Sequence, residues 1–478
     1  MSEIGDTDFG VQVGIGFLGK VATAVIGLLG SIVVARVLGA AGYGIFYVSL
    51  SIASLLGNTI TGWSGASKKR MTETDFDTRE ALGAVLVADA LAIALGGPAA
   101  YLVLRRLTAN PIIPVAVPVL FATTSPYLAL NSLLSGRANF SLSAWSGTVN
   151  TLVQTAGKVA LVLLGFGVWG MIGGTALGPL LVVPLVLQWI GVSPALPSMD
   201  SLRSIARYAR WSIPNGLVGT ALSRMDTLLL GWLATASIAG KYQVALQITM
   251  PALFLSNVIG TGLMGRVSNL ESRGEAWTED LWNSLSYGPI LAVPIFFGSL
   301  VIGEELAVTV FSGQYSGAGI FVVGLALYRL LNTQYRPFRT VIGGLDRPEL
   351  NFRISAVSFG LNVALGIGLW VPLGALGVIL ATVLTGFVTY LLTLHYVREL
   401  VDLEFVLTTP LLKQYAAGAI MAGAVFGLKR TIGIGSWLDV VGYLGLGAVL
   451  YGAVLYCWSP HLRSTARGIW RDFRGTAR

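Results

Sequence analysis

Six ionisable side chains lie inside long apolar runs of this sequence. They are four cations and two anions: Lys20, Lys158, Arg224, Arg329, Asp89 and Asp226. An ionised side chain at the centre of a bilayer costs roughly 2.5–3.5 kcal/mol on insertion scales, unless it faces a partner or a watery cavity. The surplus of cations suits a site for an anionic group such as a phosphate, because cationic side chains replace its water and counter-ions.

Structural pairing is the alternative reading of these charges. Lys20 or Lys158 would then neutralise Asp89, and Arg224 would bond Asp226 or a backbone carbonyl. Arg224 and Asp226 are two positions apart, so they do not face each other on one helix. The two acids are counter-ions in one interpretation, and in the other they carry protons or Na⁺ for coupling.

The composition requires a membrane to hold these runs. Of 478 residues, 54% are hydrophobic and only 11% are charged, and the mean hydropathy is +0.74. Ordinary soluble domains carry about 25% charged residues. The composition therefore excludes a soluble enzyme, a disordered chain and a disulfide-stapled module, and it predicts an all-α membrane protein. One Cys and two His leave no material for a metal centre, and we expect no cofactor.

Spanning helices need about 20 mostly apolar residues. We expect about 14 of them, at 11–34, 44–66, 81–104, 114–136, 146–166, 171–190, 214–234, 242–262, 285–303, 320–343, 354–371, 373–395, 411–428 and 436–457.

The loops predict the orientation, because Lys and Arg favour the cytoplasmic side. Most of the 31 basic residues fall on that side if both termini are cytoplasmic, and this count includes Arg336 and Arg339 among the cytoplasmic residues. No basic segment precedes the first apolar run, so we expect no cleavable signal peptide. The predicted location is the cell membrane, as a multi-pass protein.

A basic run, 203–211, connects two of the predicted spans. Arg203, Arg207 and Arg210 alternate with Ile205 and other apolar residues, among them Tyr208 and Trp211. This spacing predicts an amphipathic helix on the cytoplasmic leaflet. A charge run that only anchors the topology is an equal alternative.

The two halves of the chain contain an internal repeat. Three pairs of segments match in the same order: NFSLSAWS at 139–146 with NFRISAVS at 351–358, 44–52 with 240–248, and Gly170-x-x-Gly173 with Gly374-x-x-Gly377. We expect an N-terminal lobe of six helices at 1–200 and a C-terminal lobe of six at 201–400. Two further helices and a basic tail occupy 401–478. Such repeats are typical of transporters, with the substrate path at the interface between the repeats.

Two segments resemble a known family. ARVLGAAGYGIFYVSLSI at 35–52 and SRMDTLLLGWLATASIAGKYQVALQI at 223–248 are similar to the oligosaccharide flippases, the polysaccharide-transporter branch of the multidrug/oligosaccharidyl-lipid/polysaccharide exporters. Lys241 splits the Gly-Tyr pair of that pattern. The resemblance implies two six-helix lobes in a V around a cavity. It also implies a sugar chain on a polyprenyl or dolichyl phosphate or pyrophosphate as substrate, moved from the cytoplasmic to the outer leaflet.

The residues and the resemblance together predict a flippase that works by alternating access, and no enzyme. Lys20, Lys158, Arg224 and Arg329 would bind the substrate phosphate, and no residue would be catalytic. The expected partners are the lipid-linked oligosaccharide and membrane lipids, with glycan-assembly enzymes as further candidates. Nucleic acid is not expected.

Two rival functions stay open. A drug/cation antiporter of the same fold would need acids to dominate the cavity, whereas cations dominate here. A membrane-embedded, lipid-dependent glycosyltransferase would need an acid pair or a His in a large outer loop. The outer loops offer only Glu304, Glu305 and Asp439.

Overall fold

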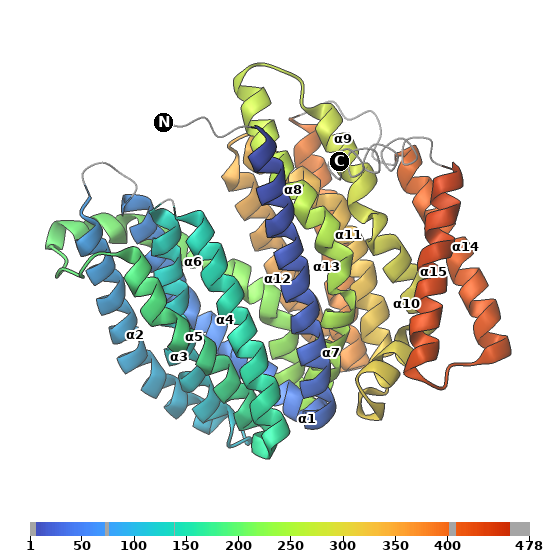
Figure 1. Cartoon of the computed structure of the whole chain (residues 1–478), viewed down its shortest axis with the longest axis horizontal. Coiled ribbons are helices and arrows are strands. Elements are labelled where there is room, and N and C mark those ends of the chain that lie inside the picture. Colours follow the sequence, from blue (N-terminus) through green and yellow to red (C-terminus); the bar gives the residue numbers. More distant parts are fainter. Residues whose placement is uncertain (1–5, 72–75, 138, 401–407, 459–478) are drawn as a thin grey trace. The chain divides into compact units, whose positions relative to one another are not determined.

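The computed structural model describes the backbone of residues 6–71, 76–137, 139–400 and 408–458, and side chains from residue 23 onward except that of residue 140. All regular structure in these ranges is helical (Figure 1). The helices are α1 Asp6–Met71, α2 Thr78–Leu107, α3 Ile113–Gly136, α4 Phe140–Leu161, η1 Val162–Phe166, α5 Gly167–Ile190, α6 Met199–Leu233, α7 Ala236–Thr249, η2 Met250–Leu253, α8 Phe254–Ser272, α9 Thr278–Tyr287, η3 Gly288–Ile290, α10 Ala292–Val310, η4 Gly313–Tyr315, α11 Gly319–Gly344, α12 Pro348–Leu373, α13 Ala375–Arg398, α14 Thr409–Ile432 and α15 Trp437–Trp458.

Within the described residues, ten helical ranges are long and apolar enough to cross a membrane, which makes the chain a multi-pass membrane protein. One of them contains a break at Gly39 (φ 66°, ψ 178°), between two of the predicted spans. Another, Ser141–Ile190, covers both α4 and α5. Helices α6 and α11 overlap predicted spans but fall outside the ten, because the polar residues within them lower their hydropathy. The count of about 14 stays a prediction.

The chain divides into two compact units, Met1–Gly240 and Lys241–Arg478. These units follow packing, whereas the expected lobes 1–200 and 201–400 follow the sequence repeat. Helix α6 lies in the first unit although its sequence opens the second repeat. The lobe boundaries therefore stay a prediction.

In the first unit, α1 packs closely along α6, and at Ala40 and Gly44 it touches the start of α7. A methyl group on Gly44 would overlap the carbonyl of Ala236, and one on Gly240 would overlap that of Ala40. Such glycines allow helix backbones to touch. We call this contact the α1–α6 seam.

Polar groups fasten the other end of the seam. Asn58 Nδ2 donates to the carbonyl of Ile213 (3.3 Å), and Thr220 Oγ1 donates to Asn58 Oδ1 (2.9 Å). Ser212 Oγ donates to the carbonyl of Gly62 (2.8 Å). These bonds satisfy polar groups that would be costly to bury alone.

The second unit has two apolar clusters. Helices α10, α14 and α15 share one, which includes Val293, Met421 and Tyr451. Helices α8, α9 and α11 share the other with α12 and α13, and it includes Leu285 and Phe338. Helix α11 thus buries one face and leaves another for polar residues.

Each unit contains a helical hairpin, α4–α5 in the first and α12–α13 in the second. Gly167 (φ 57°, ψ −134°) and Gly374 (φ 55°, ψ −135°) have the same unusual conformation. Three residues later, a methyl group on Gly170 would overlap the backbone of Leu161, and one on Gly377 that of Leu369. The hairpins therefore have matching turns, which supports the internal repeat.

The register of this match differs from the sequence alignment. The structure pairs Gly167 with Gly374 and Gly170 with Gly377, so the alignment of Gly170 with Gly374 is wrong by three positions. Helix α4 begins at Phe140 and α12 at Pro348, one helical turn from the NFSLSAWS–NFRISAVS match. Small and apolar residues recur every three or four positions in such helices, so a one-turn slip still aligns similar residues.

Candidate functional site

Lys158 is a half-buried cation in the last turn of α4, directly before the π-helical turn η1. Gly157 and Gly174 let α4 and α5 touch here, because a methyl group on Gly174 would overlap the backbone nitrogen of Lys158. Among the described residues, the Lys158 ammonium has no hydrogen-bond or ion-pair partner. A cation held rigidly without a carboxylate is suited to an anionic ligand.

Arg224 is a second half-buried cation, on α6. The Tyr47 hydroxyl of α1 interacts with it electrostatically, and no carboxylate in the described part of the chain pairs with it. The pairing of Arg224 with Asp226 that sequence left open is therefore absent. Asp226 is half-buried on the same helix.

Asp89 is buried on α2, with 4% of its surface exposed. Ser125 Oγ of α3 donates to Asp89 Oδ1 (2.7 Å). Lys158 does not pair with it, so this candidate ion pair is also absent. A hydroxyl bond helps to hold a buried carboxyl group in place without neutralising it.

Two of the predicted cations remain. Lys20 lies in the first part of α1, outside the residues whose side chains the structure describes. Arg329 lies on α11, and its Nε atom is buried with no hydrogen-bond partner among the described residues. Burial of an unsatisfied charged donor is costly, so this guanidinium is poised for a ligand or for water.

The structure adds two arginines to α11 that sequence reasoning had counted among the cytoplasmic residues. Arg336 donates to Asn257 Oδ1 of α8. Arg339 Nη2 donates to Ser355 Oγ of α12 (2.7 Å), and its Nε donates to Asn351 Oδ1 (3.2 Å). These partners are neutral, so both positive charges persist.

Helix geometry places three of these polar residues on one side of α11. Arg329, Asn332 and Arg336 follow a spacing of three and four, which is one helical face. This seven-residue spacing of arginines inside a predicted span was the signal that could have revealed Arg336.

The described cations thus form two groups. Lys158 and Arg224 lie on α4 and α6, which both pack against α1 in the first unit. Arg329, Arg336 and Arg339 lie on α11 in the second unit. That Lys158, Arg224 and Arg329 face one common cavity with Lys20 stays a prediction.

A known family matches just over half of the chain. The family is described as "Polysaccharide biosynthesis protein", and its pattern covers residues 68–319, which include Asp89, Lys158 and Arg224. The chain belongs to this family. The resemblance to the polysaccharide-transporter branch is thereby confirmed.

The likeness to individual proteins spans nearly the whole chain. The "Probable low-salt glycan biosynthesis flippase Agl15" of Haloferax volcanii is 25% identical over 464 residues, covering 94% of this chain and 96% of that protein. Among solved structures, "Lipid II flippase MurJ, inward closed conformation" has a TM-score of 0.78 at 14% identity, covering 93% of this chain and 98% of that one.

A second solved structure shares the fold less closely. It is the "Inward-facing conformation of a multidrug resistance MATE family transporter of the MOP superfamily", with a TM-score of 0.57 at 16% identity. It covers 79% of this chain and 95% of that one. Both likenesses show that the chain shares the fold of these structures.

Proposed function

We propose that this protein is a flippase that moves a lipid-linked oligosaccharide from the cytoplasmic to the outer leaflet. The lipid is a polyprenyl or dolichyl chain, and a phosphate or pyrophosphate joins it to the sugar. The name of the Haloferax volcanii relative, a probable glycan biosynthesis flippase, supports this proposal. Membership of a polysaccharide biosynthesis family supports it as well.

One observation carries the proposal. Lys158, Arg224 and Arg329 lie within predicted membrane spans and have no carboxylate partner among the described residues. No described carboxylate offsets the cost of holding these cations in the membrane. A phosphate group carries the opposite charge and cannot cross hydrocarbon alone. Binding the phosphate to the cations would therefore lower the cost of placing both in the membrane.

The transport cycle follows from this pairing. In the inward-open state, Lys20, Lys158, Arg224 and Arg329 take the phosphate while the lipid tail stays in the bilayer. The lobes then rock and the site opens to the outside, as in other repeat transporters. Asp89 and Asp226 serve as counter-ions or carry the coupling ion.

The drug/cation antiporter remains the main rival. The likeness to a multidrug transporter concerns the fold alone. A cation carrier would need a free acid in its site, whereas the described cations exceed the described acids in the apolar helices. We therefore favour an anionic substrate.

Deletion of the gene tests the function directly. We expect the lipid extract of the deletion strain to accumulate a lipid-linked glycan, while the corresponding surface glycan disappears. The wild-type gene should restore the surface glycan. Unchanged lipid extracts and surface glycans would contradict the proposal.

Charge-deletion variants test the site in the same strain. Lys20→Ala/Arg224→Ala should insert normally and fail to restore the glycan. Arg105→Ala/Arg106→Ala removes two exposed cations at the end of α2 and is the matched control, which should restore it. Full activity of the first variant would exclude the proposed site.

A further inference from the structure

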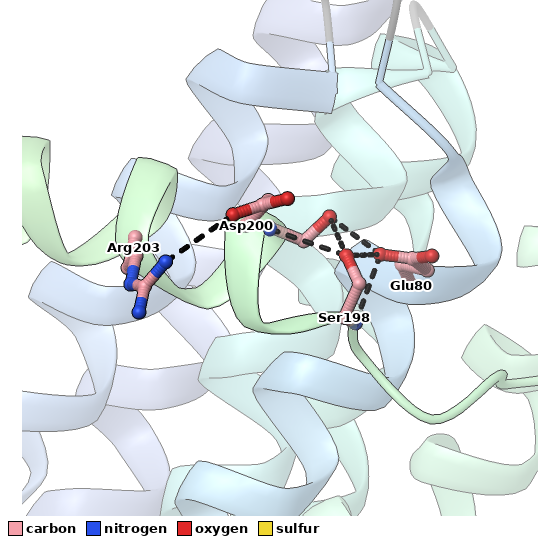
Figure 2. Close-up of polar contacts among 5 residues, drawn as sticks. Glu80, Ser198, Asp200 and Arg203 are labelled. Carbon is pink, nitrogen blue, oxygen red and sulfur yellow. Dashed lines mark hydrogen bonds and ion pairs between the residues drawn. The ribbon is translucent and has the colours of Figure 1, made fainter.

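The N-terminal turns of α6 are fixed to the first unit by a capping network (Figure 2). Ser198 Oγ accepts from the backbone nitrogen of Ser201 (3.2 Å) and so caps the helix. Glu80 Oε2 of α2 accepts from the backbone nitrogen of Ser198 (3.1 Å) and from its Oγ (2.8 Å). Ser201 Oγ also donates to this carboxylate. The network sets how these turns are rotated about the helix axis.

One side of these turns is buried. Ile205 and Ala209 are 0% and 2% exposed, and they pack with Ala66 of α1 and Ala84 of α2. The spacing of the basic run predicts an amphipathic helix on the leaflet, but the run is not a separate helix. It is the start of α6, and this packing determines which residues lie on the opposite, exposed face.

The opposite face carries cations and large apolar side chains. Arg203, Arg207 and Arg210 are spaced four and three apart and are all exposed. Trp211 is 71% exposed beside them, with the Arg210 guanidinium 5.6 Å from its ring centre. We call these four residues the α6 basic face.

Other basic residues of the same unit are used differently. Lys68 Nζ donates to Ser135 Oγ (2.8 Å), and Arg70 Nε donates to the carbonyl of Ser204 (3.3 Å). Arg79 and Arg137 likewise bond the carbonyls of Ser193 and Ile190. These side chains fasten helix ends to one another.

The α6 basic face makes no such bonds. The described residues give Arg207 no partner. Arg203 meets only Asp200 (3.5 Å), and both side chains are mostly exposed, so the pair is weak. The positive charge of this face is therefore available to an external anion.

The length of α6 places the Trp211 end of this face beside the headgroups. The helix has 35 residues, or about 52 Å, against about 30 Å of hydrocarbon and roughly 5–8 Å of headgroups on each side. If residues from Pro214 onward cross the hydrocarbon, Trp211 and Arg210 lie about 5 Å and about 6 Å outside it, among the headgroups, whereas Arg203 lies about 16 Å outside, in the water beyond them. Trp and Arg are the side chains that favour this zone.

We propose that the α6 basic face binds the anionic headgroups of the bilayer lipids on the cytoplasmic side. The arginines match the phosphates in charge, and Trp211 inserts at the interface. The proposal needs α6 to enter the membrane with its N-terminal end on the cytoplasmic side, as the loop charges predict, and it does not need glycan transport, so it stands or falls separately from the flippase function.

A fluorescent probe on the face tests the proposal. Cys457 is the one cysteine of the chain, so Cys457→Ser gives a cysteine-free background. Ala206→Cys then places a bimane label on the same exposed side of α6. The labelled full-length protein is reconstituted in phosphatidylcholine vesicles with and without phosphatidylglycerol, each containing a lipid spin-labelled near its headgroup.

We expect stronger quenching in the anionic vesicles, with the difference lost at 1 M salt, where charges are screened within about 3 Å. Arg207→Gln/Arg210→Gln should raise the phosphatidylglycerol fraction needed for half-maximal quenching by at least about five-fold. Arg105→Gln/Arg106→Gln, with the same loss of charge, should leave that fraction unchanged.

Three results would overturn the proposal. One is equal quenching in neutral and anionic vesicles, and another is an equal effect of the two double variants. The third is loss of glycan transport in pure phosphatidylcholine by Arg207→Gln/Arg210→Gln, which would assign the face to the substrate path. A failure of transport in the parent protein would refute the flippase function and leave the quenching result intact.

Discussion

The hairpins α4–α5 and α12–α13 have the same turn and hold their helices together in different ways. In the first, Gly157, Gly174 and Gly178 bring the backbones into contact. In the second, hydroxyl groups bond across the interface, with Ser358 and Thr389 at 2.7 Å. Leu161 of the first hairpin is equivalent to Leu369 of the second, and in the same register Lys158 is equivalent to the buried Gly366. The cation is therefore present in one of the two repeats only.

This difference shows that the two repeats share the backbone geometry of the turn but not the side chains along the helices. A glycine contact fixes the backbone of Lys158 without surrounding its side chain, so the charge stays available. The hydroxyl contacts of α12–α13 consume their polar groups internally. We infer that the first hairpin serves the substrate and the second serves packing.

The largest expected effect belongs to Lys158→Met. Vesicle transport of lipid-linked glycan should fall at least about ten-fold, because a phosphate contact to a charged donor is lost. The free energy of unfolding should rise by about 1–2 kcal/mol, because an unpaired buried charge is removed.

Lys158→Arg should keep most of the transport, and Lys413→Met, at the start of α14, serves as the charge control. If Lys158 had a purely structural role, the Lys158→Met protein would be less stable than the wild type. A lower free energy of unfolding would therefore contradict our assignment.

Gly174→Ala should be the next most damaging change. Its methyl group would overlap the backbone of Gly157 and Lys158, so α4 and α5 must separate. We expect the free energy of unfolding, measured by thermal unfolding in detergent, to fall by about 1–3 kcal/mol. Transport should also be weaker. Gly368→Ala on α12 is the control, since nothing lies within 4 Å of its added methyl group. Equal stability of the two variants would refute the close contact.

The two turn glycines provide a test of equivalence. Gly167→Ala and Gly374→Ala each force a residue with a side chain into a left-handed conformation, with no neighbour within 4 Å. The cost is then backbone strain alone, about 1–3 kcal/mol in each case. Thermal unfolding should give the same loss for both. A difference of more than about 1 kcal/mol would show that the turns are not equivalent.

The smallest effect is expected for the hydroxyl pair of the second hairpin. A double-mutant cycle of Ser358→Ala and Thr389→Val should give a coupling of about 0.6 kcal/mol, the usual value between membrane helices. Transport should stay within about two-fold of wild type. Thr151→Val is the control, because Thr151 Oγ1 bonds only a carbonyl of its own helix. A strong transport defect in Ser358→Ala would give the second hairpin a role in substrate handling.

The sequence was sufficient for the fold class, the family and the break in α1 near Gly39, because apolar runs and helix breakers are local signals. It also located Arg224 and Arg329 within helices. Charged and polar residues lower the hydropathy of α6 and α11, so these two predicted spans are not among the ten apolar ranges of the described residues.

The partners of the charges could not be predicted from sequence. Asp89 bonds Ser125 and not Lys158, which depends on how α2 and α3 are rotated. Arg336 and Arg339 are bonded to amides and a hydroxyl of other helices, and a count of loop charges cannot detect that. The repeat was found but placed one turn out of register, because small residues recur at helical intervals.

The α1–α6 seam has a mechanical consequence. At Gly44 of α1 and Gly240 in the first turns of α7 no side chain separates the helix backbones, so this end can act as the fulcrum of a lever. Gly62 lies 18 residues farther along α1, or about 27 Å away. A rotation of about ten degrees around the fulcrum would carry Gly62 roughly 5 Å from Ser212, given that lever length. A small rotation at the glycine end would therefore break the hydrogen bond between Ser212 and Gly62 at the other end.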